Sequence, residues 1–174
     1  MKKTLIILVL LVAVAGMISV SAFNRNMDDV VGYIDGNAVK AAELQSYVDT
    51  LLGDNYRKKM DSKEGRKELF NHYVNRKLLL EYAKENVEEG DSFVTSHTMG
   101  NVSTESAMLS AVLKKEVNDK VKYTEEDIRE LMASDVRFSD AQSAERELIS
   151  QKRLKLFYTF MNKLKAEHKI ELAG

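Results

Sequence analysis

The side chains best suited to acid–base or metal chemistry are three histidines, His72, His97 and His168, which lie far apart in the sequence. None of them has a second histidine at the spacing of metal ligands. Glu68 lies one helical turn before His72, but one such pair supplies too few ligands for a metal site. The chain has no cysteine, which excludes disulfides, thiol catalysis and cysteine-based metal sites. We expect each histidine to be a surface or boundary side chain.

Acidic residues that are adjacent in sequence are the other candidates for chemistry. They occur at Asp28-Asp29, Glu88-Glu89 and 125–127. Neighbours on a helix point roughly 100° apart, so such runs form solvated faces or helix caps rather than acid–base pairs. The sequence contains neither a phosphate-binding G-x-x-x-x-G-K-[ST] loop nor a G-x-S-x-G nucleophile turn. It therefore predicts no catalytic, metal or cofactor site, and a protein that is not an enzyme.

Composition indicates a folded protein without a nucleic-acid partner. Of the 174 residues, 44% are hydrophobic and 30% are charged, which is typical of globular domains. The formal net charge is −1, and lysines and arginines alternate with acids along the chain. A nucleic-acid-binding protein would show a basic patch or stripe instead.

The N-terminus has the order of a secretory signal peptide. Two lysines precede the apolar run Leu5–Ala15, and small residues follow up to Ala22. We expect cleavage after Ala22, with residues 23–174 forming one domain. The alternative is an uncleaved signal anchor, because Leu5–Ala22 as a helix spans about 27 Å, close to the ~30 Å of a bilayer core. Either reading places the protein in the periplasm or on the outer face of the cytoplasmic membrane, in the second case tethered through Leu5–Ala22.

Strand signals occur at both ends of the remaining sequence. Residues 30–34 are rich in β-branched and aromatic side chains, and Asp35-Gly36 is a strong signal for a two-residue hairpin turn. Residues 37–39 form the expected return strand, and 170–172 alternate as a short final strand would.

Between these strands the pattern is helical. The first helix runs from Ala41 to Gly53 and the second from about Ser62 to Val87. Asp91 or Ser92 is a candidate cap for a third helix, whose apolar pattern becomes clear from about Ser103. Further helices are expected after Thr124 and at Ser139, whose S-x-x-Q pattern matches a capping box. The buried stripe of the second helix is predicted to consist of Phe70, Tyr73, Val74, Leu78 and Tyr82, with the stem of Lys77 at its boundary. The last helix ends near His168, and its predicted buried positions are Leu154, Phe157, Met161 and Leu164. The predicted fold is mainly α, a multi-helix body with a small N-terminal β-hairpin joined by a short C-terminal strand.

Four segments, in this order, resemble the SurA/PrsA/PpiD family of envelope chaperones. They are the strand, Asp-Gly turn and first helix at 30–44, the second helix at 70–84, the helix junction Lys115–Ile128, and the closing helix and strand at 153–172. The resemblance covers about residues 30–172. It implies a body like the N-terminal domain of SurA, in which the last strand pairs with the N-terminal hairpin. Lys40 stands where members of the family often have a serine or threonine helix cap.

The sequence departs from the isomerase-bearing members of this family at one place. Those members carry a parvulin domain before the closing helix, whereas here only a short connection, Ser134–Ser143, is present. The resemblance therefore implies an ATP-independent chaperone that binds unfolded or exported polypeptides and prevents their aggregation, without prolyl isomerase activity. The alternative is a membrane-anchored helical adapter that binds one dedicated protein. Self-association into a homodimer is left open.

A surface that holds varied polypeptides needs adaptable apolar side chains, and methionine is the most adaptable of them. Seven residues are the candidates for contact with clients: Phe93, Met99, Met108, Met132, Phe138, Tyr158 and Met161. The alternative for each is an ordinary place in the core.

Overall fold

The computed structural model of the chain describes residues 29–88 and 90–173. The expected signal segment, Leu5–Ala22, lies outside them. The described residues form two compact units, 29–74 with 169–173, and 75–168. No helix within the described ranges is long and apolar enough to cross a membrane.

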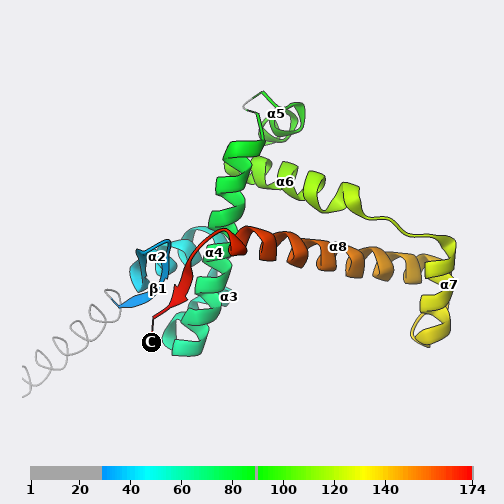
Figure 1. Cartoon of the computed structure of the whole chain (residues 1–174), viewed down its shortest axis with the longest axis horizontal. Helices are drawn as coiled ribbons and strands as arrows, with labels where there is room; N and C mark the ends of the chain where they lie inside the picture. The colour runs from blue at the N-terminus through cyan, green and yellow to red at the C-terminus, as the bar shows by residue number, and fades with distance from the viewer. Residues whose placement is uncertain (1–28, 89, 174) are drawn as a thin grey trace, which may run out of the picture. The chain divides into compact units, whose positions relative to one another are not determined.

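A three-stranded antiparallel sheet organises the first unit, and both ends of the described chain contribute to it (Figure 1). Strand β1 (Val30–Ile34) lies between β2 (Asn37–Lys40) and β3 (Ile170–Leu172). Asp35 and Gly36 form the hairpin turn with positive φ angles of 50° and 81°, as the Asp-Gly signal predicts. The pairing of the last strand with the hairpin is also confirmed, with Tyr33 opposite Glu171.

Asp35 fixes the register between β1 and the C-terminal strand. Its backbone N–H donates to the carbonyl oxygen of Lys169 at 2.8 Å. Its side-chain Oδ1 accepts from the backbone N–H of Lys169, also at 2.8 Å. Because side chains alternate between the two faces of a strand, these two hydrogen bonds determine which residues of β3 face the core.

The helices of the first unit follow the hairpin directly. They are α2 (Ala41–Tyr47), the π-helical turn η1 (Val48–Leu52), α3 (Asp54–Arg57), the 3₁₀ turn η2 (Lys58–Asp61) and the first half of α4 (Lys63–Asn86). Helix α2 begins after Lys40, whose side chain provides no cap, consistent with the missing serine or threonine. The apolar pattern predicts no helix between Gly53 and Ser62, so α3 and η2 differ from the prediction.

Helix α4 packs against the sheet through a close approach at Gly32. A Cβ atom at this position would lie 2.5 Å from Cζ of Phe70 and 2.7 Å from the carbonyl oxygen of Glu171. Phe70 is fully buried, as are Leu44, Val48 and Val74. The absence of a side chain at Gly32 therefore lets the Phe70 ring lie directly on the sheet.

The second unit is entirely helical. It holds the second half of α4, α5 (Ser92–Thr98), α6 (Thr104–Glu116), the 3₁₀ turn η3 (Asn118–Lys120), α7 (Glu125–Ser134) and α8 (Ala141–Ala166). The candidate cap Asp91 and the expected start after Thr124 are confirmed, because each side chain accepts from a backbone N–H of the first turn. The apolar pattern from Ser103 belongs to a separate helix, α6, which Ser103 itself caps. The expected cap at Ser139 is wrong by one residue: Asp140 accepts from the N–H of Ser143.

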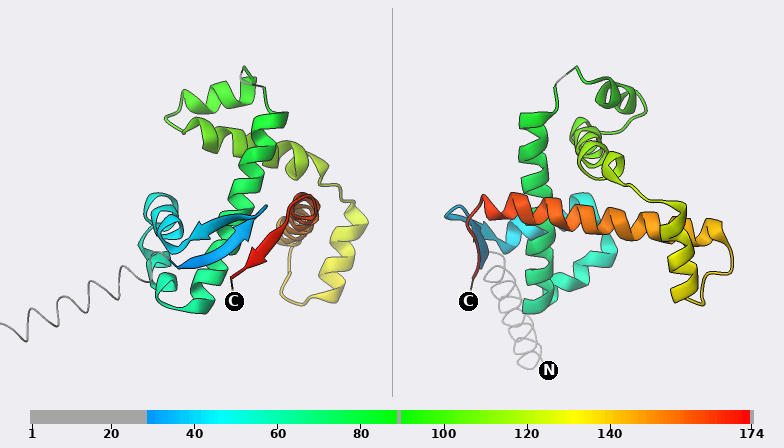
Figure 2. Two further views of the ribbon diagram at one scale, coloured as in Figure 1. Left: turned by 60° about the vertical axis from the view of Figure 1, so that its left-hand side comes forward. Right: turned by 45° about the vertical axis from the view of Figure 1, so that its right-hand side comes forward.

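Helices α4, α6 and α8 share the core of this unit. The rings of Tyr82 on α4 and Phe160 on α8 meet edge to face with centroids 5.0 Å apart. The hydroxyl of Tyr82 donates to Oε1 of Glu116 on α6 at 3.1 Å, and burial together with this carboxylate raises the pKa of Tyr82. Figure 2 shows these helices from two further sides. The described chain is thus mainly helical with a small antiparallel sheet, as predicted.

Replacing Gly32 tests the contact between α4 and the sheet. Gly32→Ala is expected to lower the free energy of unfolding by about 1–3 kcal/mol, since either Phe70 or the β3 backbone must move. Urea unfolding followed by circular dichroism measures the change. Gly90→Ala is the matched control, because no atom lies within 4 Å of the corresponding Cβ position. Equal stability of the two variants would contradict the close approach.

Candidate functional site

Helix α8 buries two different faces along its 26 residues. In its N-terminal half Ala144 and Leu148 are buried, and in its C-terminal half Phe160 and Leu164 are buried. At roughly 100° per residue, these two sets point about 120–160° apart around the helix axis. The first half packs with α7, whereas the second half packs on α4 through the ring of Tyr82.

Between the two buried halves α8 presents an uncovered apolar face, which we call the α8 face and define as Leu154, Phe157 and Tyr158. Leu154 is 53% exposed and Tyr158 is 56% exposed, while Phe157 is half-buried. Leu154 and Phe157 belong to the stripe that the sequence predicts to be buried. The stripe continues as buried core at Met161 and Leu164. The α8 face is therefore the part of a core-type stripe that no described element covers.

Helix α7 is held to α8 through its N-terminal cap. Thr124 and Asp127 form a reciprocal capping box, in which Asp127 Oδ2 accepts from the backbone N–H of Thr124 at 2.8 Å. The same Oδ2 also accepts from Nζ of Lys152 on α8 at 3.0 Å. The hydroxyl of Tyr123 donates to Oε1 of Glu145 at 2.5 Å. These contacts position α7 along the first half of α8 and leave the second half to α4 and α6.

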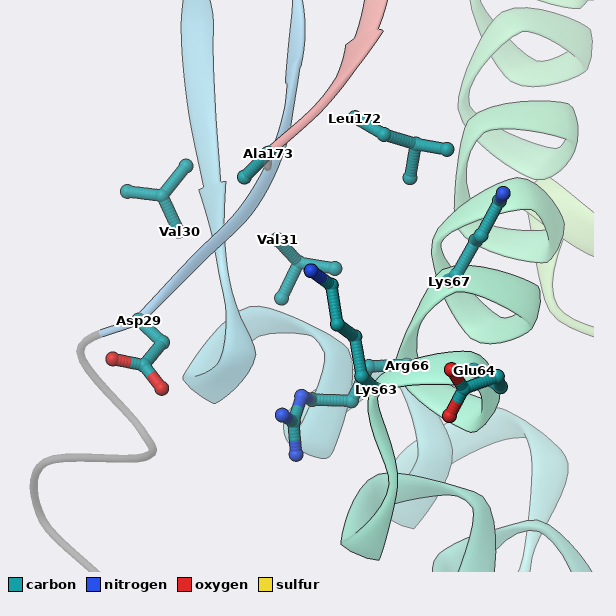
Figure 3. A pocket seen from close by; sticks show the side chains of 9 residues that line it. All are labelled: Asp29, Val30, Val31, Lys63, Glu64, Arg66, Lys67, Leu172 and Ala173. Atoms are coloured by element: carbon teal, nitrogen blue, oxygen red, sulfur yellow. The ribbon is translucent and has the colours of Figure 1, made fainter.

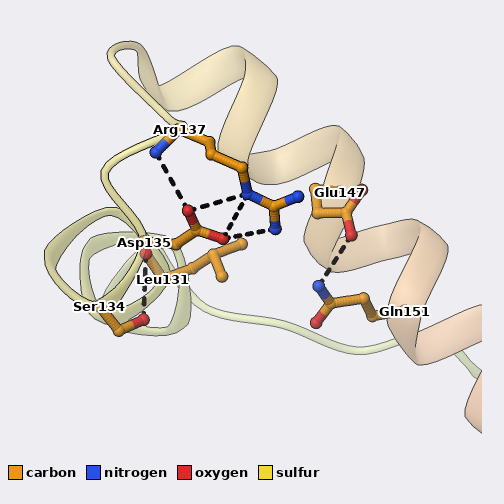
Figure 4. Close-up of polar contacts among 6 residues, drawn as sticks. All are labelled: Leu131, Ser134, Asp135, Arg137, Glu147 and Gln151. Carbon is orange, nitrogen blue, oxygen red and sulfur yellow. Dashed lines mark hydrogen bonds and ion pairs between the residues drawn. The ribbon is translucent and has the colours of Figure 1, made fainter.

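Residues 135–140 join α7 to α8 directly (Figure 4). Asp135 organises this connection: its Oδ1 accepts from the backbone N–H and from Nε of Arg137, each at 3.0 Å. The hydrogen bonds from Arg137 lower the pKa of Asp135. On the first turns of α8, Gln151 donates to Glu147 at 2.8 Å. Val136, in the same connection, is 99% exposed.

Six of the seven predicted client contacts reach the surface at least in part, but they lie on different elements. Met99 is 81% exposed in the turn after α5, and Tyr158 is on the α8 face. Phe93 on α5 is half-buried and stacks on His97 with ring centroids 4.0 Å apart. Three others are half-buried: Met108 on α6, Met132 on α7, and Phe138 in the connection that follows α7, beside the guanidinium of Arg137.

The prediction that Met161 contacts clients does not fit its position, because this side chain is 1% exposed and belongs to the core of the second unit. Sequence reasoning also assigned Leu154 to the core, whereas the structure leaves it at the surface, and it omitted Val136. Periodicity identifies the apolar stripe of a helix, but it does not show where along the helix the covering element ends. Only the fold shows that the apolar stripe of α8 extends beyond the helices that cover it.

One hollow of the first unit has a volume of about 720 Å³ (Figure 3). Val31 and Leu172 supply its apolar part, and Lys63, Arg66 and Lys67 on the first turns of α4 face them. Arg66 also donates to the carbonyl oxygen of Met60 at 2.8 Å. Asp29 and Glu64 complete the lining with two carboxylates. The hollow is thus a mixed, open surface without a nucleophile beside a base.

The histidines and acidic runs do not converge into a reactive group in the described part of the chain. His72 lies beside the ring of Tyr56 with centroids 6.1 Å apart, and His97 stacks on Phe93. The run at 125–127 forms the first turn of α7. Within the described ranges, no cluster of histidine and acidic side chains is suited to hold a metal ion.

Comparison with known proteins does not assign the chain to a family. A scan against protein-family models finds no match, and no curated protein matches the sequence significantly.

The link between α7 and α8 is expected to depend on pH. Hydrogen bonds from the Thr124 backbone and from Lys152 lower the pKa of Asp127 from its ordinary value of 3.8. Because the folded-state pKa lies below the unfolded one, the carboxylate stabilises the fold at neutral pH, and this contribution is lost as the pH falls through the folded-state pKa.

Asp127→Ala should therefore speed amide hydrogen exchange of α7 at pH 7, and the difference from the parent protein should shrink under strongly acidic conditions. Glu130→Ala, an exposed acid on the same helix, is the control. Unchanged exchange of α7 in Asp127→Ala at pH 7 would show that the cap does not hold this helix.

Proposed function

We propose that this protein is an ATP-independent chaperone of the cell envelope, which binds unfolded or exported polypeptides and prevents their aggregation. The observation that carries the proposal is the α8 face, where Leu154 and Tyr158 continue a core stripe without cover. Contiguous exposed apolar patches on folded domains are typical of interaction surfaces, unlike single scattered apolar side chains. The order of segments that resembles the SurA/PrsA/PpiD family supports the same function.

The short connection between α7 and α8 supports holding rather than catalysis. Residues 135–140 connect α7 to α8. In the SurA/PrsA/PpiD family, which the sequence resembles, the isomerase-bearing members carry a parvulin domain at the corresponding place. The remaining exposed apolar side chains, among them Met99 and Val136, are separate from the α8 face in sequence. Several weak contact points suit a protein that binds many sequences, because no single pocket then selects one client.

The proposal is tested by aggregation of a denatured envelope protein, followed by light scattering without nucleotide. The protein is used in the form that the producing cell accumulates, whether processed or anchored. Suppression at near-stoichiometric ratio for several unrelated clients is expected. If the aggregation of no client is suppressed and one protein copurifies, a dedicated adapter is favoured instead. Prolyl isomerase turnover at ordinary enzyme concentration would contradict the proposal.

Substitution of the α8 face provides the residue-level prediction. Leu154→Ser with Tyr158→Ser should weaken client affinity by about tenfold, as expected for losing about 1–2 kcal/mol of apolar contact. Stability should change by less than about 1 kcal/mol, because both side chains are exposed. Leu51→Ser, at a position 50% exposed in the first unit, is the matched control and should retain suppression. Equal loss in both variants would remove the α8 face as the contact site.

A further inference from the structure

The charge of α8 is segregated along its length. From Leu148 to Ala166 every charged side chain of the helix is positive, and these are Lys152, Arg153, Lys155, Lys163 and Lys165. The chain as a whole has a formal net charge of −1, so this segment departs from the mixed pattern elsewhere. The α8 face lies within it.

The cations border the apolar face on both sides. Arg153 and Lys155 are the sequence neighbours of Leu154, and both are exposed. At roughly 100° per residue, they lie about 100° to either side of Leu154 around the axis, and Lys165 returns to the Leu154 side three turns later. Lys152 is engaged by Asp127. Among the ion pairs of the described residues, none involves Arg153, Lys155 or Lys165.

We infer that the α8 face selects extended polypeptide segments in which acidic residues lie next to apolar ones. This inference rests on the proposed function and specifies its client chemistry. The apolar part of a segment would cover Leu154 and Tyr158, and its carboxylates would meet Arg153, Lys155 and Lys165. Complementary charge of this kind adds selectivity and speeds encounter more than it adds affinity.

An anionic membrane surface has similar charge, but it fits the helix less well. A helix that lies in a membrane interface needs a long, continuous apolar face. On α8 the exposed large apolar side chains are Leu154 and Tyr158, and the stripe beyond them is buried at Met161 and Leu164. A single extended segment needs only a short uncovered stretch.

The first turn of α7 limits where a client carboxylate can bind. Glu125 and Glu126 are exposed there, and Asp127 of the same turn holds Lys152. A carboxylate placed near Lys152 would therefore be repelled by neighbouring acids. Client acids are expected to lie toward the C-terminal half of α8, beside Lys155 and Lys165.

The test uses two fluorescent, unstructured peptides of the same apolar composition, one rich in glutamate and one with glutamine at the same places. Anisotropy titration with the purified protein is expected to show about threefold to tenfold tighter binding of the acidic peptide at low salt, from two or three exposed charge pairs. The preference should vanish near 1 M salt, where the Debye length falls to about 3 Å.

Charge reversal locates the preference. Arg153→Glu with Lys155→Glu should abolish or invert the preference while leaving binding of the glutamine peptide unchanged. Lys84→Glu with Lys115→Glu, at two exposed lysines of the same unit outside α8, adds the same charge and should retain the preference. If both double variants lose it equally, overall charge rather than the α8 face is responsible, and the inference is overturned.

The remaining outcomes separate this inference from the proposed function. Equal affinity of the parent protein for both peptides, with aggregation still suppressed, would overturn the charge selectivity and leave the chaperone standing. Binding of neither peptide and no suppression would overturn the proposed function itself. Binding to vesicles that contain phosphatidylglycerol, lost in the Arg153→Glu/Lys155→Glu variant and without any peptide preference, would assign the face to membranes instead.

Discussion

The central strand β1 receives its two neighbours from opposite ends of the described chain. Its pairing with β2 is local, whereas its pairing with β3 closes a loop that contains all the helices of residues 29–88 and 90–173. A two-stranded hairpin is only marginally stable alone, so the third strand is required for a stable sheet. Asp35 holds that strand with two hydrogen bonds to Lys169, and Phe70 covers the sheet because Gly32 leaves room for its ring. The first unit therefore cannot be complete until the chain has passed through the second.

Within the second unit the constraint is that one helix serves two partners. Helix α8 has one buried face in its first half and a different one in its second, so the covered stripe must change sides between Leu148 and Phe160. Along this interval neither partner covers the full width of the helix, and Leu154 remains exposed. The surface that we propose to bind clients is thus a consequence of how α7 and α4 divide α8, rather than of residues added for binding.

Sequence reasoning succeeded where the signal is local. The Asp35-Gly36 turn and the caps at Asp91 and Thr124 follow from backbone chemistry that a few neighbouring residues determine. It failed at α3 and η2, which are single turns too short for periodicity to reveal, and at Ser139, where Asp140 competes for the same cap. The burial of Met161 agrees with the periodicity of the last helix, whereas the exposure of Leu154 depends on the extent of partner helices that are distant in sequence.

A chaperone that uses no nucleotide has to release its clients through weak binding. Covering Leu154 and Tyr158 supplies on the order of 1–2 kcal/mol, and each exposed charge contact adds about 0.2–1 kcal/mol. Association itself costs at least about 4 kcal/mol in lost freedom, so one client segment on the α8 face is held weakly. Useful holding then requires several segments of one chain to engage at once, since linked contacts multiply affinity without slowing the release of any single segment. The separate exposed side chains at Met99 and Val136 supply further points for such contacts, and a client that folds withdraws its apolar segments from all of them.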